Sequence, residues 1–204
     1  ILFFFGIGTI TQALVGRFYG GNDIDGLRSQ LHQSIWLTLC LGVVGVLSIL
    51  MAAMLLMDAG FEPDMASRAN DYLLAIVWGA IPMTMLPALR GSLEAMSLTR
   101  AVLLINFSIF IINIPLDYFL IYGLYGFPQL GAEGCAWATA FLLWLGLFSN
   151  LAMLNWHHSI RHLSVLKNFQ CPQWQIIRQT FVLGLPIGFS VLIEMIMFSG
   201  AGML

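Results

Sequence analysis

Residues 101–123 read AVLLINFSIFIINIPLDYFLIYG, an apolar run whose single charged side chain is Asp117. A bilayer core of about 30 Å is crossed by on the order of 20 helical residues that rise about 1.5 Å each. The run is therefore long enough and apolar enough to cross a membrane as one helix. A stretch of this length and composition indicates an integral membrane protein.

Similar apolar stretches lie on both sides of this run, and the whole composition agrees with them. Hydrophobic residues make up 59% of the chain and charged residues 9%, far below the roughly 25% charged residues of soluble domains. The sequence thus predicts an all-α polytopic transmembrane helix bundle of about six spans. The other expected spans are residues 1–16, 34–57, 72–90, 135–155 and 180–204. Because the chain opens and stops inside apolar runs, we expect a fragment.

The basic residues predict an orientation. Alternating the spans places seven of the eight Lys and Arg residues on one face, and only Arg68 on the other. The positive-inside rule then makes the first face cytoplasmic. The expected cytoplasmic loops are 17–33, 91–100 and 156–179. Within the first of them, Ile24, Leu27 and Leu31 have the spacing of an amphipathic helix lying on the membrane surface.

Several function classes find no support in the sequence. The net charge of −2 and the lack of a basic run argue against nucleic-acid binding. Neither GxGxxG nor GxxxxGK occurs, and no enzyme active site is visible. We therefore expect no enzyme, no cofactor and no transition metal. The closest approach to a metal motif is His157, His158 and His162, which stand in an ordinary basic juxtamembrane segment without acidic neighbours.

Asp117 is the more informative of two acidic residues within the expected spans. A carboxylate in the bilayer centre costs on the order of 3 kcal/mol, so a functional role with a polar partner is the first hypothesis. Asn113 lies four residues earlier, on the same helical face. Pro115 between them removes the backbone N–H that would bond the Ile111 carbonyl. Such an oxygen-rich pocket suits a hard cation, and the carboxylate can instead take up a proton.

Glu194 is the second such acid, about midway along the last span and after Pro186. A kinked helix with one buried carboxylate also suits a cation or proton site. Pro82 and Pro87 are expected to break the span 72–90, giving a further hinge. Gly131 and Gly134 are expected to allow close helix packing. The alternative role of Glu194 is a hydrogen bond between helices. The alternative for Asp117 is that it only reaches water at the end of its span or bonds Asn113.

Several segments in order resemble one family. They are TITQALVGRFYGG (residues 9–21), LRGSLEAMSLTR (89–100), INIPLDYFLIYG (112–123), GAEGCAWAT (131–139) and LGLPIGFSVLIE (183–194). The chain is similar over nearly its whole length to the multidrug and toxic compound extrusion (MATE) family, in its NorM-type branch. One departure is Ala101, where relatives commonly have Pro.

The resemblance implies a twelve-helix antiporter of two six-helix lobes. Residues 1–155 would be the second to sixth helices of the N-terminal lobe, 156–179 the cytoplasmic inter-lobe loop, and 180–204 the truncated seventh helix. It also implies cation binding or coupling by Asn113, Asp117, Thr139 and Glu194. The coupling ion would be sodium or a proton, and the exported compounds would be amphipathic and often cationic. The remaining partners would be the lipid bilayer of the inner membrane and the missing part of the same polypeptide.

Two alternatives stay open at this point. A lipid-linked precursor flippase of the same superfamily would share the architecture, although it should line its cavity with basic residues, which avoid the spans here. A non-transporting structural membrane subunit would not depend on Asp117.

Overall fold

The computed structural model describes residues 2–58, 63–123, 129–158 and 170–201, and most of these residues are helical. The all-α prediction is confirmed. The helices are α1 (Leu2–Gly20), α2 (Ile24–Asp58), α3 (Pro63–Ile76), the 3-10 segment η1 (Val77–Gly79), α4 (Ala80–Ala95), α5 (Thr99–Tyr122), α6 (Ala132–Trp156) and α7 (Trp174–Ala201). Parts of the loops expected at 58–71, 124–134 and 156–179, including His162, lie outside the described residues.

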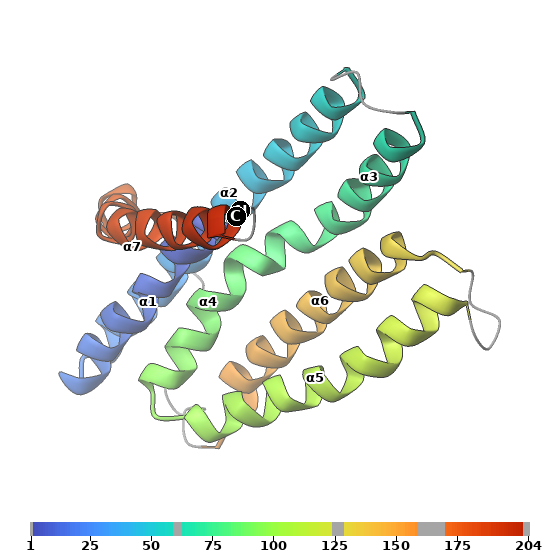
Figure 1. The fold of residues 1–204 in the computed structure, drawn as a ribbon. Coiled ribbons are helices and arrows are strands. Elements are labelled where there is room, and N and C mark those ends of the chain that lie inside the picture. The colour runs from blue at the N-terminus through green and yellow to red at the C-terminus, as the bar shows by residue number, and fades with distance from the viewer. Residues whose placement is uncertain (1, 59–62, 124–128, 159–169, 202–204) are drawn as a thin grey trace.

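Five segments of the described chain are long and apolar enough to cross a membrane. They are Ile24–Leu56, Asp64–Ala95, Thr99–Tyr122, Ala132–Trp156 and Trp174–Ser199. The second of them combines α3, η1 and α4 into one span, as Figure 1 shows. The first helix, α1, is not among the five. The molecule is therefore a multi-pass membrane protein.

Local sequence explains where several helices begin and end. The Asp23 carboxylate accepts a hydrogen bond from the Gly26 backbone N–H at 2.9 Å, which caps the start of α2. Pro63 is the first residue of α3, where its missing N–H would have had no helical partner. Gly123 ends α5 with φ of 68°, in the left-handed region that glycine adopts without steric cost.

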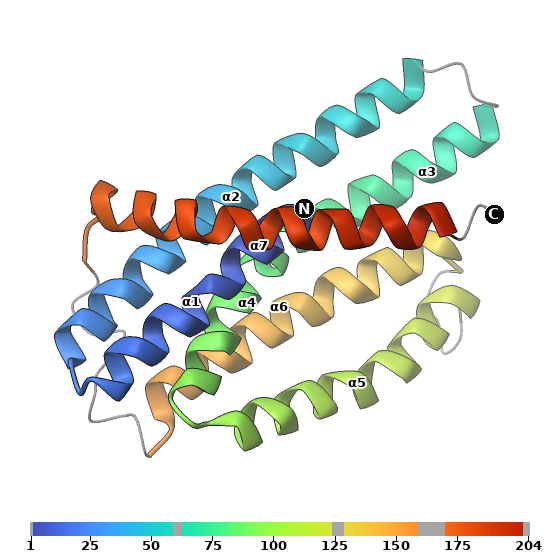
Figure 2. The same ribbon diagram turned by 60° about the vertical axis from the view of Figure 1, so that its left-hand side comes forward.

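The helices alternate in direction, as the sequence predicts. Figures 1 and 2 show the end of α1, the α4–α5 turn and the end of α6 at one end of the bundle, and the end of α5 with the start of α6 at the other. Helix α1 packs against α2, α4 and α7, whereas α5 packs against α6 and α4. The two outermost helices, α7 and α5, therefore lie on different sides of the molecule (Figure 1).

The best-packed part of the interior lies near the end of the bundle that holds the α4–α5 turn. It combines fully buried side chains of α1, α2, α4 and α6. Among them are Val15, Leu31, Leu89 and Leu154, each no more than 1% exposed. Large apolar residues are exposed along the whole length of α5 and toward the far end of α2, for example Ile114 and Met54. In a membrane such side chains face lipid at little cost.

Two predicted loops are wrong in extent. Residues 24–31 do not form a separate surface helix, because Leu27 and Leu31 are 1% exposed and belong to the interior of α2. Residues 91–100 are not a loop either, because α4 runs to Ala95 and α5 starts at Thr99. In both places the helix contains polar residues, and hydropathy alone therefore predicted a loop where the helix continues.

The prolines differ in their effect on the backbone. The helices run unbroken through Pro87, Pro115 and Pro186. Near Pro82, by contrast, the 3-10 segment η1 separates α3 from α4. Pro82 has no N–H to bond the carbonyl of Trp78, four residues earlier. That carbonyl instead accepts a hydrogen bond from the indole Nε1–H of Trp144 on α6, at 2.9 Å. The break thus ties η1 to α6.

This tie gives a testable pair of variants. Trp144→Phe is expected to lower the free energy of unfolding by about 1–3 kcal/mol, because it leaves the Trp78 carbonyl without a donor. In a Pro82→Ala background the restored N–H can bond that carbonyl, so the same change should cost clearly less. Thermal unfolding of the four proteins in one detergent measures the coupling. Equal costs in both backgrounds would contradict this role of Trp144.

Candidate cation site between α5 and α6

The site starts from a close crossing of α5 and α6. A Cβ added at Gly134 would lie 2.7 Å from the Leu120 carbonyl oxygen, so only glycine permits this approach. The Leu130 backbone N–H also donates to the Leu120 carbonyl at 3.1 Å. The predicted packing role of Gly134 agrees with this geometry, whereas a Cβ at Gly131 would meet nothing within 4 Å. The Gly134 crossing fixes the positions of the residues that follow it.

From this crossing, both helices carry their polar residues toward the middle of the bundle. On α5, Asp117 and Asn113 lie three and seven residues from Leu120, or about 4.5 and 10 Å along the axis. On α6, Thr139 lies five residues after Gly134, or about 7.5 Å. Since the helices are antiparallel, Thr139 lies between Asp117 and Asn113 along the helix axis.

A cavity of about 330 Å³ opens between these helices and α4. Asn113 and Thr139 line it together with Asn106 and apolar residues that include Leu86 and Phe110. The structure therefore brings Asn113 and Thr139 to one cavity. Asp117 is not part of its lining, but it follows Asn113 by one turn on the same face of α5.

The oxygen atoms of these residues lack protein partners within the described chain. Asp117 Oδ1 is buried and makes no hydrogen bond there. Thr139 also makes no side-chain hydrogen bond with a described residue, although Ser149 on the same helix donates to the carbonyl four residues earlier at 2.7 Å. A buried acceptor without a donor is unfavourable unless something else satisfies it. A bound cation or a proton would do so.

Glu194 does not join this group. It lies on α7, is exposed, and belongs to a helix that packs against α1 and α2 rather than α5 or α6. Pro186 lies in the same helix. The structure thus separates the two carboxylates that the sequence singled out, and Glu194 is not part of the lining of the cavity between α5 and α6.

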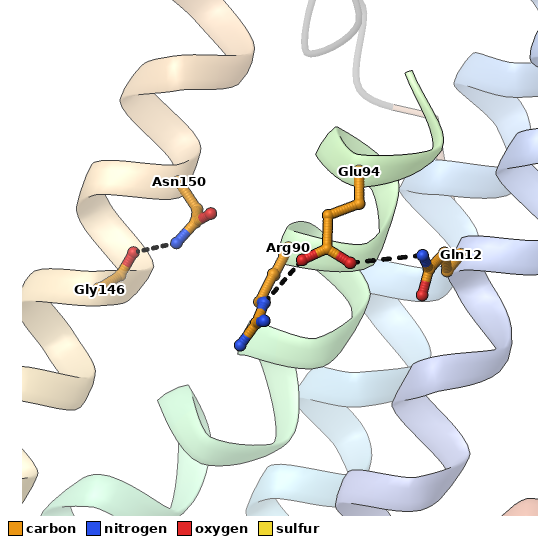
Figure 3. Close-up of polar contacts among 5 residues, drawn as sticks. All are labelled: Gln12, Arg90, Glu94, Gly146 and Asn150. Carbon is orange, nitrogen blue, oxygen red and sulfur yellow. Dashed lines mark hydrogen bonds and ion pairs between the residues drawn. The ribbon is translucent and has the colours of Figure 1, made fainter. Parts of the chain in front are cut away.

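A polar group that the sequence analysis missed lies near the end of α4 (Figure 3). The Glu94 carboxylate accepts hydrogen bonds from Arg90 Nε at 2.8 Å and from Gln12 Nε2 of α1 at 3.3 Å. On α6, Asn150 is 1% exposed and its Oδ1 has no donor within the described chain. Arg90 and Glu94 stand four apart, a spacing typical of helical ion pairs, so this signal was available.

No metal centre emerges from the described residues, among which no three His, Cys, Asp or Glu side chains gather. His157 and His158 are described, and His162 is not. Carboxylate, amide and hydroxyl oxygens such as those at the α5–α6 cavity suit hard cations better than transition metals.

Fold and site together define a multi-pass helical membrane protein with a largely apolar cavity between α4, α5 and α6 that three polar side chains line. The sequence pattern of the family described as MatE matches residues 1–119, more than half of the chain. The chain belongs to the MatE family.

Individual relatives agree with this assignment. The chain is 31% identical over 205 residues to the multidrug resistance protein MdtK of Photorhabdus laumondii, covering 98% of this chain and 44% of that protein. It therefore spans about half the length of the curated relatives it matches. A solved inward-facing multidrug resistance MATE family transporter superposes with a TM-score of 0.77 at 24% identity, over 94% of this chain and 42% of that one. A solved outward-facing multidrug resistance MATE family transporter superposes with a TM-score of 0.71 at 26% identity, over 97% of this chain and 43% of that one.

The Gly134 crossing can be tested directly. Gly134→Ala is expected to lower the free energy of unfolding by about 1–3 kcal/mol, because its methyl group would press on the backbone of Leu120. Gly20→Ala is the matched control, since a Cβ there meets nothing within 4 Å. Thermal unfolding in detergent should show a lower midpoint for the first variant only. Equal midpoints would contradict the crossing.

Proposed function

We propose that the chain is part of a cation-coupled multidrug efflux antiporter that works by alternating access. The single observation that carries the proposal is the group of oxygen-bearing residues at the α5–α6 cavity, with the buried, unpartnered Asp117 Oδ1. Membership of the MatE family and the names of the relatives, which are multidrug resistance proteins, support the same function.

The proposed ion site consists of Asp117, Asn113 and Thr139. The carboxylate supplies the negative charge, and the amide and hydroxyl oxygens replace part of the hydration shell of the ion. Sodium would be held by all three, whereas a proton would be taken up by Asp117 alone. In either case the ion satisfies an oxygen that the protein leaves without a donor. Glu194 on α7 is proposed as a second, separate coupling group.

Coupling follows if ion and substrate favour different conformations. A ligand shifts a conformational equilibrium only by its difference in affinity for the two states. An ion at Asp117 would change the charge between α5, α6 and α4, and the packing of these helices would respond. The solved MATE family transporters named above include inward-facing and outward-facing forms, as alternating access requires.

The substrates we propose are amphipathic and often cationic small molecules. Apolar and aromatic walls with few polar groups are typical of sites for such compounds. The remaining polypeptide, with a first helix and a C-terminal lobe, is proposed to complete the substrate path. Residues 1–155 would then belong to the N-terminal lobe, 156–179 to the connection and 180–204 to the next lobe. We further propose the inner membrane as its location, with 17–33, 91–100 and 156–179 cytoplasmic.

The test is efflux of a fluorescent cationic dye from inverted vesicles that contain the whole transporter. An imposed sodium or proton gradient should drive dye movement, and the gradient that works identifies the ion. Asp117→Asn should reduce gradient-driven transport to the background, because it removes the charge that binds the ion. Asp71→Asn is the matched control, because it makes the same chemical change at an exposed position of α3, and it should leave transport intact.

Thr139→Val refines this test because it keeps the side-chain volume and removes one neutral oxygen. If sodium couples, the concentration for half-maximal transport should rise by about tenfold, which corresponds to about 1.4 kcal/mol. If a proton couples, this variant should behave like the original protein. Dye transport that is absent under both gradients would refute the antiporter, and transport indifferent to Asp117→Asn would remove Asp117 from the mechanism.

A further inference from the structure

A second cavity, far from the proposed ion site, lies between α1, α2 and α7. Its volume is about 750 Å³, and its lining includes Arg17 from the end of α1, Ser29 from the start of α2 and Arg178 from the second turn of α7. The segments meet because Gln30 Nε2 of α2 donates to Thr180 Oγ1 of α7 at 2.8 Å, within the buried part of the contact. Three helices therefore build one basic cavity.

The two arginines of this cavity have no acidic partner. Neither Arg17 nor Arg178 forms an ion pair with a described carboxylate. Within the described part of the chain, no acidic residue lines the cavity. The nearest carboxylates in sequence are already engaged, since Asp23 caps α2 and Asp25 pairs with Arg28 at 3.5 Å. The cavity thus presents two guanidinium groups to an incoming ligand.

Two guanidinium groups with a neighbouring hydroxyl suit a phosphate. Arg binds phosphate oxygens through paired N–H donors, and the resulting charge-assisted hydrogen bonds are stronger than neutral ones. The Ser29 hydroxyl and the amides of Gln175 and Gln179 add neutral donors to the same lining. A phosphate monoanion or diester is therefore the chemical group that the cavity would recognise.

The apolar part of the lining favours a lipid over a free phosphate. Leu14 precedes Arg17 by about one turn on α1, whereas Val182 and Leu183 follow Arg178 by about one turn on α7. Helix α1 ends and α7 begins on the same side of the molecule (Figure 2). By their positions in these helices, all three apolar residues therefore lie farther from that end than the arginines. Charged groups at the mouth and apolar side chains below match a phospholipid headgroup and its acyl chain.

The expected orientation places this cavity at a suitable membrane surface. By the positive-inside rule, the end that holds Arg17 and Arg178 faces the cytoplasm. Basic cavities between membrane helices on that side bind the headgroups of anionic lipids. We propose that the cavity between α1, α2 and α7 binds the phosphate headgroup of one anionic phospholipid, with its acyl chain along Leu14, Val182 and Leu183. The observations that support this site do not depend on the proposed transport function.

Native mass spectrometry of the purified protein, supplied with phosphatidylglycerol or phosphatidylcholine, tests the proposal. The original protein should retain about one phosphatidylglycerol and little phosphatidylcholine. Arg17→Gln with Arg178→Gln should reduce retention of phosphatidylglycerol by about thirtyfold. Arg100→Gln is the matched control, because Arg100 is exposed at the same end of the bundle but does not line the cavity. The Arg100→Gln variant should retain as much phosphatidylglycerol as the original protein.

Two further measurements keep the proposal falsifiable. If the double variant does not fold, Ser29→Asp places a carboxylate in the lining while keeping both arginines, and it should also expel phosphatidylglycerol. Inorganic phosphate at millimolar concentration should fail to displace the lipid. Equal retention by the arginine variant and the Arg100 control would overturn the site. Displacement by inorganic phosphate, or equal retention of phosphatidylcholine, would overturn the identity of the ligand.

Discussion

Close contact between helix backbones at glycines holds this bundle together. Within a bilayer, lipid chains are as apolar as Leu, so helices associate through close packing rather than through the hydrophobic effect. Helix α1 depends on this contact on two sides. A Cβ at Gly91 of α4 would lie 2.8 Å from Gln12 Cβ, and a Cβ at Gly188 of α7 would lie 2.8 Å from the Phe3 carbonyl oxygen. The Gly134 crossing does the same for α5 and α6.

These contacts bring polar groups together inside an apolar medium, where an unpaired group is costly. The structure meets that cost at some groups and leaves it at others, which include Asp117 Oδ1 and Asn150 Oδ1. The Trp78 carbonyl, which loses its helical donor at Pro82, receives the indole N–H of Trp144. Asp117 Oδ1 receives no donor from the described residues. Among the buried described atoms without a donor, Asp117 Oδ1 belongs to the one carboxylate, and this makes Asp117 the candidate binding group.

Helix α5 connects two polar regions of the molecule. Asn106, Asn113 and Asp117 share one face, because they are spaced by seven and four residues. Asn106 lines two cavities. One is the cavity that Thr139 also lines, and the other is a cavity of about 460 Å³ that Arg90 and Glu94 line. The basic cavity between α1, α2 and α7 stands apart from both, which is why its ligand can be tested separately.

The sequence by itself determined the class of fold and the residues worth testing. Long apolar runs cannot be hidden in a soluble domain, and a carboxylate within such a run needs a partner, so the helices, Asp117 and Asn113 followed from local chemistry. Tertiary structure alone decided that Leu27 and Leu31 are buried, that Glu94 bonds Gln12, and that Glu194 lies apart from Asp117. Hydropathy reports whether a segment enters the membrane. Which helices meet there depends on backbone approach between residues distant in sequence, and no local pattern encodes it.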